Sequence, residues 1–404
     1  MIYSFRELTS AKDIRLKNVY RQIRKYPKID INQLKEITGY KHATCVRLLE
    51  ELIENKLIDD SDLGDSSGGR PPKLYKINKN INYLVGIDIG YLFIKIVLLN
   101  LNLEIVCLEK IPVDETATPE KMLKFVEESI DMFLEKKKLS REKILGVGLG
   151  ILPKYDRKKI IIDSKEPFSK LGWSDFKIKE KIEEATKYQV FVESGMNLSA
   201  LAEYRKQYFG NAESLLFISN DVSLKSSAII NGKFVYKGDE EINGIEHMII
   251  DIEGNQCSCG FKGCLGTYCT LPVLEKKIKE NPKMVENDNG AEITYLEMIG
   301  EIDHENPYFI KERDNLAYYF GVGVSNMILQ MHPDVVIIGG TLGIRMYEKI
   351  INIVSERLLL LGLADKTVIH VMNDEFNSVS QGAGCLVFDY FIEEDNSLEI
   401  QNKN

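Results

Sequence analysis

The chain has 404 residues, of which 44 % are hydrophobic, and this is enough for more than one buried core, because a single core stops growing at about 250–300 residues. Its apolar runs are far shorter than the roughly 20 residues that a membrane helix needs, and residues 1–9 carry Arg6 and Glu7 where a signal segment would be apolar. We therefore expect several domains, a cytoplasmic location and no membrane partner. The net charge of −9 taken alone argues against a nucleic-acid partner.

The charge is distributed unevenly along the chain. Residues 1–80 hold 16 Lys and Arg against 11 Asp and Glu, whereas the remaining residues hold 36 against 50. A basic head is thus followed by an acidic body, which is compatible with a DNA contact confined to the head. Ordinary solvated surfaces carry a surplus of this size as well, so the charge alone leaves both interpretations open.

Helical periodicity and capping signals divide the head into three predicted helices. Apolar residues recur with helical spacing over residues 14–26. Asp30 is a candidate N-cap for a short helix over residues 32–38, and Gly39 can adopt the left-handed conformation that ends it. A third helix is predicted over residues 41–54. Two helices joined by a tight glycine turn are typical of a helix-turn-helix, in which the second member enters the major groove of DNA.

Two predicted strands after the helices distinguish this head from a plain three-helix bundle. Residues 57–58 begin one strand, residues 73–77 form its return strand, and the segment between them is polar and contains glycine. This pattern predicts a wing. The candidate DNA contacts are the polar residues at the start of the third helix: Lys41, His42, Thr44 and Arg47.

Four residues have the types and the spacing of a metal site. Three of the seven cysteines fall within eight residues of one another, in the pattern His-x9-Cys-x-Cys-x4-Cys, and the ligands are His247, Cys257, Cys259 and Cys264. Three thiolates and one imidazole form a closed tetrahedral set that suits structural zinc. The alternative is a group of reduced cysteines without metal. We expect no structural disulfide, and we expect the other cysteines to be buried: Cys45, Cys107, Cys269 and Cys385.

After residue 80 the sequence predicts an α/β body. Residues 83–102 alternate apolar runs with a glycine turn, as in a hairpin, and are followed by a predicted helix over 119–137 and a buried strand over 143–152. Strands and helices then alternate. Residues 396–404 are largely polar and predict a frayed tail.

The body resembles the ROK family, named for repressors, open reading frames and kinases, over about residues 84–392. The resemblance lies in the segments VGIDIG, GVGLGI, LGWSDF, VESGMNLSALAE, NGIEHM, CSCGFKGCLGTY, HPDVVIIGG and QGAGC. It implies an α/β fold of the actin-like ATPase (sugar kinase) type, with two lobes that face each other across a cleft, and it supports the zinc assignment. The head, from Ile29 to GGRPPKLYKIN, is similar to the DNA-binding domain of repressors in the same family. That similarity places Arg70 of GGRPP either at the DNA or in the domain connection.

The expected domain organisation follows from this resemblance. It is a winged helix-turn-helix domain over residues 1–80, a first lobe over 81–190 together with 381–404, and a second lobe over 191–380 that contains the zinc loop.

Two departures from the family predict that the chain has lost kinase chemistry. ROK kinases carry their catalytic base in a Glu-Asn-Asp-Ala-Asn run, and the matching residues 193–197 place Gly195 at the base, which cannot accept a proton. The phosphate loop of the kinases reads Asp-x-Gly-Gly-Thr, but here Tyr91 and Leu92 follow Gly90. We therefore expect no catalytic residue and no ATP. The glycine pair before Thr341 is either a tight turn or an approach to adenosine.

The sugar-binding acids of the family are also replaced. Gly244 and Gly266 occupy positions that hold sugar-binding glutamates in the family, so a plain hexose is expected to bind weakly. The loss of three acids favours a larger or an anionic effector, such as a sugar derivative or a sugar phosphate; an empty cleft is the alternative. The candidate effector contacts are Ser194, Asn197, Glu246 and His247.

The sequence thus predicts an effector-controlled transcriptional regulator, and more specifically a repressor of carbohydrate metabolism. We expect a homodimer or homotetramer that presents two heads to an inverted-repeat operator in double-stranded DNA. Two rival hypotheses remain open: an active sugar kinase with an added head, and a scaffold whose head docks to another protein.

Overall fold

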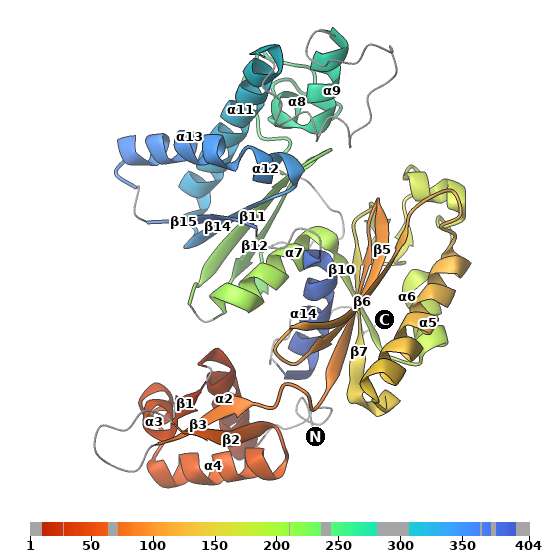
Figure 1. Ribbon diagram of the computed structural model, residues 1–404. Coiled ribbons are helices and arrows are strands. Elements are labelled where there is room, and N and C mark those ends of the chain that lie inside the picture. The colour runs from red at the N-terminus through yellow and green to blue at the C-terminus, as the bar shows by residue number, and fades with distance from the viewer. Residues whose placement is uncertain are drawn as a thin grey trace. The chain divides into compact units, whose positions relative to one another are not determined.

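The computed structural model describes residues 10–26, 28–63, 72–209, 211–235, 244–280, 307–363, 366–372 and 377–392. The chain forms two compact units, one made of residues 1–210 and 378–404 and the other of residues 211–377 (Figure 1). Among the helices that are described, none is long and apolar enough to cross a lipid bilayer.

The first unit begins with a small head of three helices and a three-stranded sheet. Its elements are α2 (Ala11–Lys25), β1 (Ile29–Asp30), α3 (Ile31–Thr38), α4 (His42–Glu54), β2 (Ile58–Leu63) and β3 (Lys73–Ile77). The strands lie in the order β1-β3-β2 with both pairs antiparallel. The predicted order of three helices and two strands is confirmed, and the short strand β1 is an addition that the sequence did not predict.

Side-chain caps explain where α3 begins and ends. The Asp30 carboxylate accepts hydrogen bonds from the backbone N–H groups of Asn32 and Gln33 at 2.6 and 3.0 Å, and the Gln33 side chain accepts one from the Asp30 backbone at 3.0 Å. At the other end Gly39 has a φ of 69°, the left-handed conformation that glycine adopts without strain. The turn between α3 and α4 is therefore short, as predicted.

The core of the head joins its three helices. The buried side chains are Leu16, Val19, Tyr20 and Ile23 of α2, Leu34 of α3, and Cys45, Leu48, Leu49 and Leu52 of α4. Val46 and Ile53 of α4 are only half-buried, because the face of α4 that meets the core is the one with Cys45 and Leu48.

The rest of the first unit is a five-stranded sheet covered by helices on both faces. Its main elements are β4 (Tyr83–Ile89), β5 (Phe93–Asn100), β6 (Ile105–Pro112), α5 (Pro119–Lys137), β7 (Ile144–Ile151), α6 (Ile178–Thr186), β10 (Val190–Ser194), α7 (Gly195–Glu203), the π-helix η3 (Tyr204–Tyr208) and α14 (Ser378–Ile392). Short segments complete it: η1 (Arg141–Lys143), β8 (Tyr155–Asp156), β9 (Ile161–Ile162) and η2 (Pro167–Leu171). The strand order is β10-β7-β4-β5-β6.

The end of the first lobe differs from the sequence-based expectation. We placed the boundary after residue 190, but β10 pairs in parallel with β7 over Val190–Ser194, so this strand is part of the first sheet. Helix α7, which follows it, packs against α14 (Figure 1). The chain therefore leaves the first unit only after residue 210.

Glycines in two central strands allow α14 to lie directly on the sheet. A Cβ atom at Gly86 of β4 would be 1.9 Å from the backbone oxygen of Ser380, and one at Gly148 of β7 would be 1.9 Å from that of Ala383. Any larger residue would push the helix away. The opposite face of the sheet packs against α5 and α6 in one continuous hydrophobic core.

The second unit contains a sheet of the same topology. Its elements are β11 (Ser214–Asn220), β12 (Leu224–Ile230), β13 (Lys233–Phe234), α8 (Gly266–Cys269), α9 (Leu271–Glu280), α11 (Pro307–Met331), β14 (Val335–Gly339), α12 (Thr341–Arg345), α13 (Tyr347–Leu360) and β15 (Val368–Val371). The strand order is β13-β12-β11-β14-β15.

The two sheets match strand for strand. In each, three antiparallel strands in sequence are followed by a strand that pairs in parallel with the first of them, and by a last strand that pairs in parallel with that fourth strand. This repeated α/β unit is the arrangement expected of an actin-like ATPase body, and it agrees with the fold class predicted from the sequence.

Candidate functional site

The candidate DNA contacts lie together at the start of α4. Lys41 is the N-cap residue of α4, and Lys41, His42 and Arg47 are exposed, whereas Thr44 is half-buried. The side chain of Tyr40, just before the helix, accepts a hydrogen bond from Asn18 of α2 at 3.1 Å. Arg70, the remaining candidate, lies outside the described residues.

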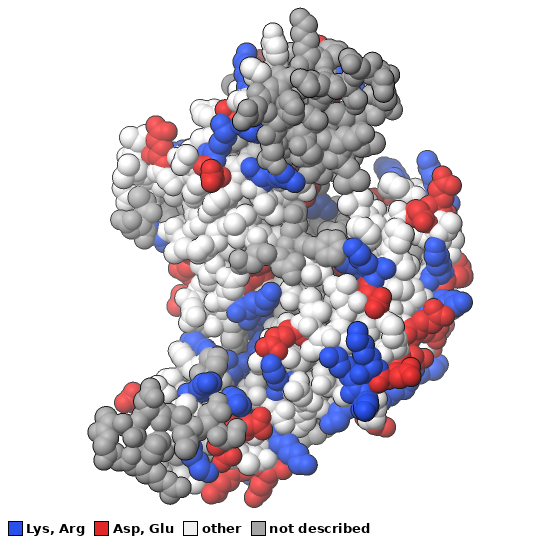
Figure 2. Space-filling view, viewed as in Figure 1, with Lys and Arg blue, Asp and Glu red and all other residues white. Residues whose placement is uncertain are grey.

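Acidic and basic side chains are mixed on the surface of the body. Figure 2 shows Lys and Arg side chains intermingled with Asp and Glu over α5 and α6. Some form ion pairs along a helix, such as Lys124 with Glu128 at 3.6 Å and Lys181 with Glu184 at 2.7 Å. A face of mixed sign does not attract phosphates, and so any nucleic-acid contact is expected from the head.

The four predicted metal ligands meet in one place in the second unit. The ligand atoms of His247, Cys257, Cys259 and Cys264 all lie within 4.8 Å of one another. The Sγ atoms of Cys259 and Cys264 are 3.6 Å apart, and Cys257 Sγ lies 3.6 Å from Nδ1 of His247. Two sulfurs at about 2.3 Å from one Zn²⁺ in a tetrahedron would be roughly 3.7 Å apart. The site therefore has the dimensions of a tetrahedral metal centre.

The backbone of the loop holds these ligands in position. Gly263 has a φ of 72°, and a Cβ atom there would be 1.5 Å from the backbone oxygen of Asp251, so only glycine fits. Its N–H donates to the Asn255 oxygen at 2.8 Å and its oxygen accepts from the Ile250 N–H at 2.9 Å. A hydrogen bond from the Cys259 backbone lowers the pKa of Cys257 to about 7, which favours the thiolate that a metal requires.

The position of the kinase base is filled by a hydrocarbon side chain. A Cβ atom at Gly195 would lie 2.5 Å from Cδ2 of Leu152. Leu152 therefore occupies the space beside Gly195, and a larger residue at this position would require Leu152 to move. Ser194 and Asn197 lie beside it at the start of α7, where Ser194 Oγ accepts from the Asn197 N–H at 3.4 Å.

Two ion pairs in the first unit were missed by the sequence analysis. Asp88 is fully buried, and Nζ of Lys95 on the neighbouring strand lies 3.0 Å from its carboxylate. Burial raises the pKa of Asp88, and the Lys95 ammonium opposes that shift. Glu193, next to the base position, pairs with Arg157 at 2.7 Å. Each of these two carboxylates is thus paired with a cation of the same unit.

The glycine pair of the second unit forms a close contact between two loops. Gly340 has a φ of 78°, and a Cβ atom there would be 2.5 Å from the backbone of Asn220. The neighbouring Thr341 N–H donates to the buried carboxylate of Asp221 at 2.7 Å. This N–H is therefore already occupied by an internal anion, which favours the tight-turn interpretation of the pair.

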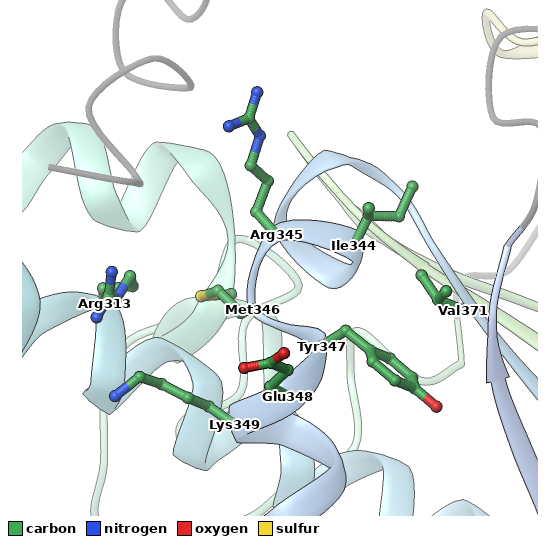
Figure 3. A pocket seen from close by; sticks show the side chains of 8 residues that line it. All are labelled: Arg313, Ile344, Arg345, Met346, Tyr347, Glu348, Lys349 and Val371. Atoms are coloured by element: carbon green, nitrogen blue, oxygen red, sulfur yellow. The ribbon is translucent and has the colours of Figure 1, made fainter.

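An open pocket of about 450 Å³ lies beyond this turn in the second unit. Its lining includes three basic side chains, Arg313, Arg345 and Lys349, together with Glu348 and Tyr347 (Figure 3). Lys349 pairs with Asp314 at 2.6 Å, so part of the positive charge is compensated. In Figure 3 Arg345 extends away from the other side chains, so the basic groups do not converge on one point.

The side chain of Glu246 lies over Gly266. A Cβ atom at Gly266 would lie 2.5 Å from Cγ and 3.1 Å from Oε1 of Glu246, so the Glu246 side chain occupies the space of the absent side chain. The two segments are joined, because the Gly266 N–H donates to the Glu246 oxygen at 2.9 Å. Near Gly244, in contrast, no described atom lies within 4 Å of such a Cβ.

Repeated α/β units of this topology, with a Cys₃His loop in the second, define a protein of the sugar-kinase type. The family model described as ROK family matches residues 84–388, and the chain belongs to this family. It is 26 % identical over 394 residues to the xylose repressor of Bacillus subtilis (strain 168), covering 95 % of this chain and 97 % of that protein. It is also 26 % identical to a glucokinase of Halalkalibacterium halodurans, covering 64 % of this chain and 80 % of the glucokinase.

Among solved structures, the chain is similar to a ROK family transcriptional regulator that is a homologue of the Escherichia coli MLC protein. The TM-score is 0.72 with 19 % sequence identity, covering 96 % of this chain and 98 % of that one. This similarity supports the overall fold, including both the head and the body.

Proposed function

We propose that the chain is a transcriptional repressor of sugar metabolism, whose head binds an operator and whose body binds a sugar-derived effector. The observation that carries this proposal is the extent of the similarity to the xylose repressor. It covers 95 % of this chain, whereas the similarity to the glucokinase covers 64 %. An alignment of that extent includes most of the basic head, whose exposed α4 residues are Lys41, His42 and Arg47.

The experiment that tests the proposal is operator binding by the full chain. Fluorescence anisotropy on duplexes from the upstream region of its own gene is expected to show binding that falls steeply with salt, because the phosphate contacts release counterions. Footprinting is expected to show half-sites separated by about 10 base pairs or a multiple, since a two-fold oligomer presents two heads. Failure to bind any duplex from its own genome would favour a protein-docking scaffold instead.

The effector contacts in this proposal are Glu246 and His247 of the second unit, and Ser194 and Asn197 at the start of α7 are proposed contacts of the first unit. The support is their agreement with the family's sugar-binding segments and the placement of Glu246 over Gly266. Because one carboxylate is retained there, the ligand is expected to include sugar hydroxyls as donors. The loss of carboxylates at residues 195 and 244 favours an anionic derivative, such as a sugar phosphate.

Moving the acid from residue 246 to residue 266 is expected to preserve effector binding. Glu246→Gln removes a charge-assisted hydrogen bond worth about 1.5–3 kcal/mol, so calorimetry is expected to show sugar binding weakened roughly 10- to 150-fold. The single variant Gly266→Glu forces the side chains of residues 246 and 266 into the same space. The double variant Glu246→Gly with Gly266→Glu restores one acid and is expected to recover most of the affinity.

The exposed residue Glu253, in the same loop, provides the control, and Glu253→Gln is expected to leave binding unchanged. A panel of D-xylose, D-glucose and glucose 6-phosphate identifies the ligand class. Unaltered affinity of Glu246→Gln for the best ligand of the panel would remove Glu246 from the site.

We expect the chain not to catalyse phosphoryl transfer, and we expect an acid introduced at residue 195 not to restore this activity. Gly195→Asp places a carboxylate against Leu152, while Asp88 stays paired with Lys95. The wild type, Gly195→Asp, and the double variant with Leu152→Gly are all expected to remain at background in a coupled ADP-release assay. Sugar-dependent ADP release by the wild type would establish the competing hypothesis of an active kinase.

The Cys₃His site in this proposal holds one structural zinc ion. The support is the donor set, three sulfurs and one nitrogen, together with tetrahedral spacing of the ligand atoms. Such a site has no open position for a reactive water, so the ion serves to fix the loop that contains Glu246 and His247. The chain is further proposed to act as a homodimer or homotetramer, as an inverted-repeat operator requires.

A further inference from the structure

One arginine of the head lies against two aromatic rings of the body in the first unit. The guanidinium carbon of Arg24, near the end of α2, is 3.8 Å from the ring centroid of Phe388 in α14 and 5.1 Å from that of Phe209. Phe388 is fully buried, and a cation over a desolvated ring is attracted more strongly than one over an exposed ring. Arg24 therefore docks α2 onto the last helix of the body.

A second arginine, from the body, contacts one of the same rings. Arg205 lies 4.5 Å from the Phe209 centroid and is buried. Its Nε and Nη2 atoms donate to one carboxylate oxygen of Asp389 in α14, at 3.2 and 2.9 Å. Phe209 is thus in contact with a cation of the head and a cation that is anchored to α14.

Phe209 of this cluster adjoins one of the two passages of the chain between the units, and α14 begins at the other. The chain leaves the first unit after residue 210, immediately beyond Phe209, and returns at Ser378, the first residue of α14. The side chain of Ser378 hydrogen-bonds that of Ser199 in α7 at 3.0 Å. This contact joins the start of α14, where the chain returns, to a helix that precedes the point where the chain leaves the first unit. Arg205 lies in the π-helix η3, a distortion that is frequent at functional sites.

Helix α2 can carry a displacement on to the DNA-reading helix. It shares the head's core with α4, and Lys12 of α2 pairs with Glu51 of α4 at 2.8 Å. Packed helices move as rigid elements, because a close-packed core has discrete arrangements. A shift of Phe209 or α14 is therefore passed through Arg24 to α4.

We propose that Arg24, Phe209 and Phe388 form a latch that couples movement of the two units to the position of the DNA-reading head. This inference rests on the proposed function for its biological outcome, but the docking of α2 on α14 does not. When the second unit moves, the latch changes the placement of α2 and with it the affinity for DNA.

The full chain with Arg24→Ala tests the latch through two measurements. Amide hydrogen exchange over residues 11–25 is expected to rise at least about tenfold, because α2 loses its docking contact. The ratio of operator Kd with and without D-xylose or glucose 6-phosphate, expected at about 5- to 150-fold in the wild type, is expected to fall to within about twofold of unity. Sugar affinity in the absence of DNA is expected to be unchanged.

Lys110→Ala is the matched control, because Lys110 makes the same type of contact with Phe93, at 4.5 Å, away from the head. It is expected to alter neither measurement. If α2 of Arg24→Ala exchanged its amide hydrogens as slowly as in the wild type, the docking would be overturned. If the ratio of operator Kd with and without sugar stayed at its wild-type value in Arg24→Ala, the coupling would be overturned. If the wild type binds neither operator nor sugar, the proposed function and the coupling fail together, while the exchange measurement still decides the docking.

Discussion

Replacing Cys264 with alanine is expected to abolish metal binding and to destabilise the second unit. Cys264 is the most buried of the four ligands, and its loss leaves two thiols and an imidazole that cannot close a tetrahedral site. Because metal binding contributes to folding free energy, a loss of only about 3 kcal/mol would lower the Tm by roughly 6–12 °C. Metal analysis and a thermal melt measure the two effects.

Cys269→Ala is the control that distinguishes the loss of a metal ligand from the loss of a buried thiol. Cys269 is also buried, five residues further along the chain, but its Sγ donates to the Leu265 oxygen at 3.4 Å and is not a ligand. This variant is expected to retain one zinc per chain and most of its thermal stability. Retention of one zinc by Cys264→Ala would rule out the proposed ligand set.

Metal removal is also expected to weaken operator binding. The zinc loop contains Glu246 and His247, so loss of the ion loosens one wall of the proposed effector site, and linkage transmits that change to the head. A chelated, metal-free preparation that binds operator as tightly as the native protein would show that the loop and the head are independent.

Local features were predictable from the sequence because their causes are local. The Asp30 cap, the left-handed Gly39 and the four ligands of the metal site depend on residue types a few positions apart. The two repeated sheets could be predicted only from the family resemblance, because neither periodicity nor spacing reveals strand order. For the same reason the predicted boundary of the first lobe was wrong, since only the pairing with β7 shows that β10 belongs to the first sheet.

The side chain that fills the space at Gly195 could not be predicted, because Leu152 does so from more than 40 residues away. Glu246, in contrast, was a candidate effector contact from the sequence, and its side chain lies over Gly266, 20 residues away. Such contacts depend on tertiary packing. The pair of Asp88 and Lys95 is different, because the predicted hairpin places these residues directly opposite each other. A lone lysine in an apolar strand was the signal that could have revealed it.

Replacing Arg47 with alanine is expected to weaken operator binding by about 5- to 150-fold. Arg47 is exposed on α4, one turn beyond the candidate contacts at its start, and an arginine that hydrogen-bonds a guanine edge contributes about 1–3 kcal/mol of discrimination. The loss is therefore expected to be greatest for the cognate sequence. Anisotropy titrations with the operator and with single-base variants measure it.

Two further variants separate base recognition from attraction to phosphates. Lys41→Ala is expected to weaken binding to all duplexes alike and to reduce the salt slope by about 1, because a helix N-terminus lies near the phosphates. Lys79→Ala is the control, since Lys79 pairs with Glu104 at 2.8 Å and its charge is already compensated. If Arg47→Ala weakened cognate and unrelated duplexes equally, Arg47 would be a phosphate contact, and sequence recognition would have to come from other residues of α4 or from the wing.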